Sequence, residues 1–322
     1  MSFSITFFHD KISNMEQLIL HAIQLLLAFG IIALLFLIIL HVRKYRINPF
    51  KRFATGFWIG LITDMLDTMG IGSFATTTTF YKLTHLIEDD SKIPGTMNAI
   101  HAIPVMVQAF CFITVVRVEP STLIPMALAS FFGALAGPHL TKGWNTKTVQ
   151  RVLGILLLIA AAFSIYRMIA DPGSHNSSAV HGLNGFWLIF GVVYNFIIGI
   201  LMTLGLGNYA PELIFFSLMG LSPAIAMPVM MLDGAMIMTA SATQFIKEKR
   251  VEWTGSAGMI IGGVLGVLIA VRFLTSLDLN LLKQFVIIVV IFTGVMMIRS
   301  SLMRSPLKSH AHSNVITRKD KS

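Results

Sequence analysis

Two aspartates in an apolar stretch are the residues of this sequence most able to do chemistry. Asp64 and Asp67 are three residues apart, so on a helix they share one face. Carboxylates held that close tend to share a proton or to bind a cation between them. The spacing therefore predicts a proton carrier or a cation site, against the alternative that both acids line a water-filled vestibule.

Other ionisable residues also stand in apolar surroundings. Asp233 has no basic neighbour in the sequence, so either its partner comes from elsewhere in the fold or the group is protonated. His101, one turn from Asn98, can bind an anion or carry a proton, although a lone histidine more often only bonds to a neighbouring helix. Glu212, which follows Pro211, is expected to cap a helix N-terminus.

Two glycine pairs interrupt long apolar stretches, at the middle of 55–84 and of 185–219. A continuous helix through 55–84 would be roughly 45 Å long, too long for one upright membrane crossing. A break frees backbone groups that the protein or a ligand must satisfy, and half-helix N-termini favour anions. The predicted anion-binding residues are Gly70, Gly72, Ser73, Thr76, Thr77, Asn98, His101, Gly205, Gly207 and Asn208, and the predicted coupling residues are Asp64, Asp67 and Asp233.

The segments that carry these residues are surrounded by a lipid bilayer. The sequence is 55% hydrophobic and only 12% charged, with a mean hydropathy of +0.77, far from the usage of a soluble domain. It predicts an all-α, polytopic transmembrane bundle with about nine membrane segments, at 18–41, 55–84, 96–116, 121–141, 149–169, 185–219, 223–246, 254–274 and 282–303.

The distribution of basic residues predicts the orientation. If the N-terminus is outside and each of the nine segments crosses once, 16 of the 24 Lys and Arg residues lie inside, which favours a cytoplasmic C-terminus. The acidic turn 88–90 then falls outside. Lys142, Lys147 and Arg151 also fall outside, against the rule. Re-entrant hairpins at the glycine breaks would change this count. We expect a multi-pass protein of the bacterial inner membrane.

An internal repeat is the most specific signal. Gly56-Phe57-Trp58 recurs at 185–187, Met69 to Ala75 resembles 204–210, and Arg117-Val118-Glu119 recurs at 250–252. The motifs keep their order at nearly constant offsets. We therefore predict the following segments: 1–54, an extra helix and basic loop; 55–170, the first membrane repeat; 171–184, a linker; 185–303, the second membrane repeat; 304–322, a polar cytoplasmic tail. Repeated halves with broken helices at matching positions are typical of transporters.

These halves resemble the sulfite exporter TauE/SafE family of membrane permeases. The resemblance covers roughly 55–303 and is carried by Pro211, by Gly95-Thr96 after Pro94, and by the four break glycines. It implies movement of sulfite, sulfonates or related sulfur-containing anions across the inner membrane. Ser73-Phe74 and Asn208-Tyr209 replace the glycines that the family usually has after each break, which alters the lining of the expected site.

The leading interpretation is a secondary transporter of a small anion, with proton coupling as one option. The alternatives are an anion channel and an intramembrane enzyme that uses Asp64, Asp67 and His101 as an acid–base set. The sequence contains no ATP-binding Gly-rich loop and no zinc-protease or serine-hydrolase motif, and it predicts no cofactor and no metal. The expected partners are a small inorganic or organic anion and membrane lipid, not nucleic acid. Small residues such as Gly133 and Gly262 allow tight helix packing, within the fold or in a homo-oligomer.

Overall fold

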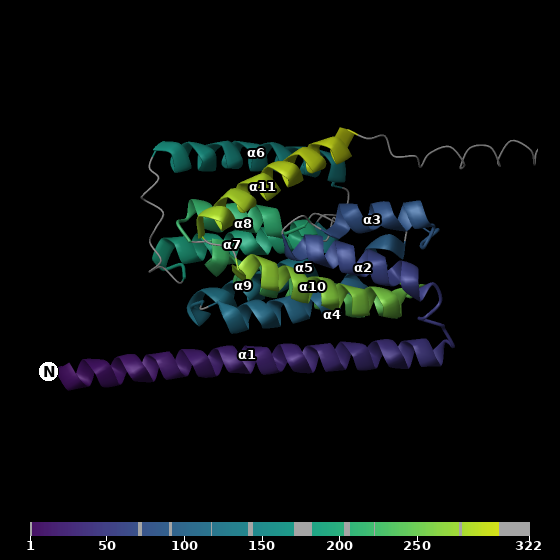
Figure 1. The fold of residues 1–322 in the computed structure, drawn as a ribbon, viewed down its shortest axis with the longest axis horizontal. Coiled ribbons are helices and arrows are strands. Elements are labelled where there is room, and N and C mark those ends of the chain that lie inside the picture. The colour runs from purple at the N-terminus through teal and green to yellow at the C-terminus, as the bar shows by residue number, and fades with distance from the viewer. Residues whose placement is uncertain are drawn as a thin grey trace, which may run out of the picture.

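The protein is seen in a computed structural model that describes residues 2–69, 73–89, 92–116, 118–140, 144–170, 182–202, 207–221, 223–276 and 279–302. Every regular element in these ranges is a helix (Figure 1). The eleven helices are α1 (Ser2–Lys44), α2 (Phe53–Thr68), α3 (Ser73–Thr84), α4 (Ile93–Val115), α5 (Pro120–Leu140), α6 (Thr146–Ala170), α7 (Gly185–Met202), α8 (Tyr209–Leu218), α9 (Pro223–Lys247), α10 (Ser256–Ser276) and α11 (Leu279–Leu302).

The predicted all-helical membrane bundle is confirmed. Six of the described helices are long and apolar enough to cross a bilayer: α1, α4, α5, α7, α9 and α10. The helices run along one common direction, with α1 on one edge of the bundle and α6 and α11 on the opposite edge (Figure 1). Central α4 and α9 pack against each other, and most of their apolar residues are buried.

The first interrupted stretch, 55–84, forms a hairpin. Helix α2 ends at Thr68, and α3 begins at Ser73 and runs back. The guanidinium of Arg52, next to the start of α2, donates hydrogen bonds to the carbonyl oxygens of Thr84 (2.7 Å) and His85 (2.8 Å) at the end of α3. Because both ends of the stretch meet, it returns to the end of the bundle from which it enters.

The second interrupted stretch, 185–219, also forms a hairpin, at the opposite end of the bundle (Figure 1). The Tyr194 ring of α7 stacks on the Phe215 ring of α8, with 4.3 Å between the ring centroids. The Tyr194 hydroxyl donates a hydrogen bond to the carbonyl oxygen of Pro211 at 2.8 Å. Helix α8 therefore runs back along α7. Each interrupted stretch thus returns to the end of the bundle where it starts.

Each hairpin packs against the other half of the chain. Helix α2 lies on α10, and α7 lies on α5, so the same pattern occurs twice. Glycines allow the backbones to touch: a Cβ at Gly60 would meet the carbonyl oxygen of Met259, and one at Gly199 would meet that of Ser130. Contacts through small residues are how helices associate in lipid, where burying apolar side chains gives little driving force.

The hairpins change which loops share an end of the bundle. The Lys51 carbonyl accepts a hydrogen bond from Gly255, and Lys92 pairs with Glu252, so the loops before α2, before α4 and before α10 lie together. Glu88 and Asp89 follow α3 and lie at this same end, so the prediction that places this acidic turn opposite the first basic loop is wrong. The hairpin is the physical reason.

We call this end of the bundle the basic end, because most of the described Lys and Arg residues lie there. Helix α5 runs toward it and α6 starts from it, which brings Lys147 and Arg151 to the same end as the other basic loops. The described basic residues at this end are Arg43, Lys44, Arg46, Lys51, Arg52, Lys82, Lys92, Lys147, Arg151, Lys247, Lys249, Arg250 and Arg299.

Candidate functional site

The first aspartate of α2 pairs with the histidine of α4. The Oδ1 atom of Asp64 lies 2.8 Å from Nδ1 of His101, and both side chains are about 1% exposed. The second atom of each group, Oδ2 of Asp64 and Nε2 of His101, is buried without a hydrogen-bond partner. The pair thus joins two of the predicted residues and leaves one acceptor and one ring nitrogen available to a ligand.

The second aspartate reaches the other hairpin. The Asp67 carboxyl forms a hydrogen bond with the hydroxyl of Tyr209, the first residue of α8. The same hydroxyl lies 3.4 Å from Oε1 of Gln108 in α4. Because Asp67 is next to the end of α2 and Tyr209 starts α8, the end of α2 and the start of α8 meet inside the bundle.

Asp233 of α9 is surrounded by polar side chains from three other helices. The Ser130 hydroxyl of α5 lies 3.3 Å from Oδ1 of Asp233, and the Asn195 amide of α7 donates to Oδ2. The Glu212 carboxyl of α8 lies against the same aspartate. The structure therefore supplies the missing partners of Asp233, and none of them is basic.

Glu212 does not cap α8 as expected. It lies in the first turn of α8 and is fully buried. Its Oε1 atom accepts a hydrogen bond from the Asn208 side-chain amide (3.1 Å), which also donates to the carbonyl oxygen of Met230 (3.0 Å). The attraction of Glu212 to Asp233 and Asn208 outweighs a capping role, because these groups approach from the neighbouring helix and the chain before α8.

The remaining predicted residues are placed less centrally. Asn98 bonds to its own helix, with its amide donating to the carbonyl oxygen of Pro94 at 2.8 Å. Thr77 is buried in α3 and its hydroxyl has no partner, and Thr76 is on the same helix. Gly207 directly precedes Asn208. Gly70, Gly72 and Gly205, as well as the side chain of Ser73, lie outside the described residues.

Sequence reasoning missed several of the buried polar residues that surround these acids. Ser130, Asn195, Gln108 and Tyr209 are all buried inside the bundle beside the acids. The available signal was weak: a polar residue inside an apolar helix must find a partner within the protein, and Asn195 stands alone in the apolar run of α7. Their positions depend on packing between helices that are distant in sequence.

We call the set of buried polar residues around the two breaks the mid-bundle cluster. It contains four carboxylic acids, one histidine and one tyrosine, and no lysine or arginine whose side chain the structure describes is buried. No group of three acid, histidine or cysteine side chains suited to a metal occurs in the described ranges. The cluster consists of Asp64, Asp67, His101, Gln108, Ser130, Asn195, Asn208, Tyr209, Glu212 and Asp233.

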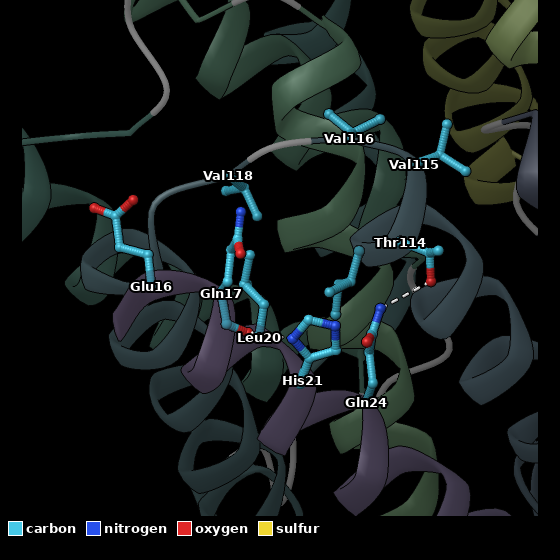
Figure 2. Close-up of a pocket in the computed structure, with 10 residues that line it drawn as sticks. Glu16, Gln17, Leu20, His21, Gln24, Thr114, Val115, Val116 and Val118 are labelled. Carbon is cyan, nitrogen blue, oxygen red and sulfur yellow. Dashed lines mark hydrogen bonds between the residues drawn. The ribbon is translucent and has the colours of Figure 1, made fainter. Parts of the chain in front are cut away.

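A separate groove lies between α1 and the end of α4, opposite the basic end. It has a volume of about 480 Å³, and Figure 2 shows polar side chains of α1 along one side of it. The Gln24 amide donates to the Thr114 hydroxyl across it at 2.8 Å. None of the residues of the mid-bundle cluster lines this groove, so the groove is separate from the candidate site.

An ion pair joins the two halves at the basic end. The Lys92 ammonium before α4 lies 3.3 Å from Oε2 of Glu252 before α10. The Thr96 hydroxyl also accepts a hydrogen bond from the backbone N–H of Glu252. Partial burial raises the pKa of Glu252, but hydrogen bonds from Thr254 and Lys92 outweigh it and hold this pKa below its usual value.

Comparison with known proteins places the chain in a family. The model of the sulfite exporter TauE/SafE family matches residues 15–164 and 187–319. The gap between the two matched regions includes the expected linker 171–184. No curated protein and no solved structure matches the chain. Since the matched regions cover most of the sequence, and the fold is a helical membrane bundle, the chain belongs to the sulfite exporter TauE/SafE family of membrane permeases.

Proposed function

We propose that this protein is a secondary transporter that moves sulfite, a sulfonate or a related small sulfur-containing anion together with protons. The observation that carries the proposal is the position of the mid-bundle cluster, where the end of α2 and the start of α8, one from each of two opposed hairpins, meet. Opposed broken helices around a buried polar centre are the arrangement of many secondary transporters. The substrate class comes from the family, and the coupling comes from the charges of the cluster.

The charges argue for protons as obligatory companions of the anion. The buried acids Asp64, Asp67, Glu212 and Asp233 are opposed by only one buried base, His101, in the described part of the chain. A further negative charge in this low-dielectric site would be expelled unless protons neutralise the acids. Anion and proton therefore bind together and cross in the same direction.

Each predicted residue receives a role in this proposal. The pair of Asp64 and His101 carries the coupling proton, with Asp67 as the next carboxyl, and Asp233 is the coupling acid of the second half. The anion binds between the breaks, where the backbone of the half-helices and the Thr77 hydroxyl supply donors. The other predicted anion-binding residues of the breaks belong to the same proposed site.

We also propose the topology that follows from the hairpins. The segments 55–170 and 185–303 would be inverted repeats, because each begins with a hairpin that enters from the opposite end of the bundle. The basic end would be cytoplasmic, according to the positive-inside rule. The N-terminus is then outside and the C-terminus inside, as expected from the sequence, and Lys147 and Arg151 no longer contradict the rule.

Uptake of labelled anions into proteoliposomes tests the function. We expect saturable uptake of sulfite or a small sulfonate that rises when the outside is made more acidic than the inside. Asp64→Asn removes the proton-binding carboxylate and should abolish the dependence on the pH gradient. Glu88→Gln, which removes the same charge from an exposed turn, serves as the matched control and should transport like the wild type.

Three outcomes would contradict parts of the proposal. Flux that rises linearly with anion concentration would indicate a channel. Saturable flux that is insensitive to the pH gradient would remove proton coupling. No flux of any of these anions, in protein shown to be folded, would remove the assignment to sulfur-containing anions.

A further inference from the structure

The two halves of the bundle build related contacts with different charges. In the first half, Asp64 of the hairpin helix α2 bonds to His101 of α4. In the second half, Asn195 of the hairpin helix α7 bonds to Asp233 of α9. Because α2 and α7 start the two hairpins, and α4 and α9 follow them, Asp233 takes the place that His101 has in the first half.

A third helix completes the correspondence. Gly263 of α10 lies against the Asp64 carboxyl, which a Cβ at this glycine would meet. Ser130 of α5 lies in the corresponding place and bonds to Asp233. Helices α10 and α5 are also the ones on which α2 and α7 pack. The polar site at Asp64 and the polar site at Asp233 therefore occupy corresponding positions in the two halves.

The second site lacks the basic side chain that the first contains. Asp64 faces an imidazole that can be charged, whereas the partners of Asp233 are an amide, a hydroxyl and the Glu212 carboxyl. Glu212 and Asp233 are both fully buried, and any charge that this pair of acids carries is negative. An isolated buried charge of this kind is costly unless a counter-charge is supplied. No described basic side chain supplies it.

The second site also has oxygen atoms available. Asn195 is fully buried, and its Oδ1 atom has no hydrogen-bond partner, although its amide nitrogen donates to Asp233. The Oε2 atom of Glu212 is also buried without a hydrogen-bond partner. Carboxylate, amide and hydroxyl oxygens are hard ligands that suit hard cations, and the site has no thiol or imidazole for a transition metal. One ionised carboxylate among these neutral oxygens would match a monovalent ion.

We propose that Asp233, Glu212, Asn195 and Ser130 form a binding site for a sodium ion. The ion takes, in the second half, the electrostatic role that His101 has in the first. Its role as a coupling ion rests on the proposed transport function, whereas its binding does not. Sodium binding between a broken helix and its neighbours is consistent with how transporters of repeated halves hold their ions.

Thermal unfolding of the purified, detergent-solubilised protein tests binding without any transport assay. A ligand that binds only the folded state raises the melting temperature in a saturable manner. We expect NaCl to raise it when NaCl replaces choline chloride at constant total salt, and KCl to raise it less. Asp233→Asn should lose the sodium-dependent shift. Asp64→Asn, which removes an acid from the related first site, should keep it.

A milder variant protects the test against misfolding. Ser130→Ala removes one neutral ligand, and we expect it to fold and to require a several-fold higher sodium concentration for half of the shift. The proposed site would be wrong if sodium and choline had the same effect on the melting temperature, or if Asp233→Asn kept the sodium-dependent rise. If sodium raises the melting temperature of the wild type but not of Asp233→Asn, and the protein takes up no anion, the sodium site is supported and the transport function is contradicted.

Discussion

At the scale of single residues, the partner decides what each acid of this protein can do. Asp64 is buried against an imidazole, and Asp233 is buried against an amide, a hydroxyl and another acid. Glu252 is half-buried at the basic end and faces the ammonium group of Lys92. The same functional group therefore serves as half of a buried acid–base pair, as a candidate cation ligand and as a link between loops.

Glu252→Gln should lower stability at neutral pH and not at low pH. The folded state holds the pKa of Glu252 below the unfolded value, which is about 4.3 for a glutamate. The stabilisation is therefore fully present above the unfolded pKa and is lost as pH falls through the folded pKa. Because the pair is about one-third exposed, we expect an effect below about 1 kcal/mol.

The measurement is the melting temperature of wild type and Glu252→Gln as the pH is lowered from neutral to below about 4. The two curves should converge at the acid end. Glu88→Gln is the control for removal of an acid at the same end of the bundle. A difference between wild type and Glu252→Gln that grows as the pH falls would contradict the sign of this prediction.

At the scale of elements, glycines determine how closely the halves interlock. Gly262 of α10 lies against the carbonyl oxygen of Phe57 in α2, and Gly133 of α5 lies against that of Phe196 in α7. The sequence left open whether the small residues serve packing within the chain or between subunits. At these positions they pack within the chain, since a hairpin of the other half already covers them.

Gly262→Ala should destabilise the bundle, because its new methyl group would meet the Phe57 carbonyl. Overpacking of this kind costs about 1–3 kcal/mol. The check is thermal unfolding in detergent. Ile261→Ala changes the neighbouring residue of α10, which is 47% exposed on the outer surface of the bundle, and should have a much smaller effect. Equal melting temperatures for Gly262→Ala and wild type would show that α2 and α10 can separate.

At the scale of the whole molecule, the two hairpins determine the topology. Each one returns to its own end of the bundle, so the chain changes sides fewer times than nine crossings require. The basic loops of both halves consequently gather at one end. The two hairpins also bring the end of α2 and the start of α8 toward the centre from opposite ends, which produces the mid-bundle cluster.

Single-cysteine labelling tests this topology. In a Cys111→Ser background, which removes the only native cysteine, we expect Lys51→Cys and Glu88→Cys to react with an impermeant maleimide from the cytoplasmic side. Ser121→Cys, at an exposed position in the first turn of α5, should react from the opposite side. Labelling of positions 51 and 88 from opposite sides would mean that the stretch 55–84 crosses the membrane instead of returning.

The sequence by itself determined the class of the fold, the boundaries of most helices and the family. Apolar runs of membrane length are a local property, so each predicted segment agrees with one helix or one hairpin to within a few residues, apart from the longer α1. Gly-x-Gly marked both breaks, because glycines in the middle of overlong stretches signal an interruption. The buried ionisable residues Asp64, Asp67, His101 and Asp233 were also recognisable, because charge inside an apolar run is rare.

Only the tertiary structure decided how these elements meet. Whether an interrupted stretch crosses or returns depends on contacts such as that of Arg52 with Thr84, between residues 32 positions apart. The pairing of Asp64 with His101, and of Asp233 with Asn195, joins helices that the sequence does not connect. Local patterns report what a segment requires from its surroundings, whereas the partner that satisfies the requirement is chosen by the packing of the whole bundle.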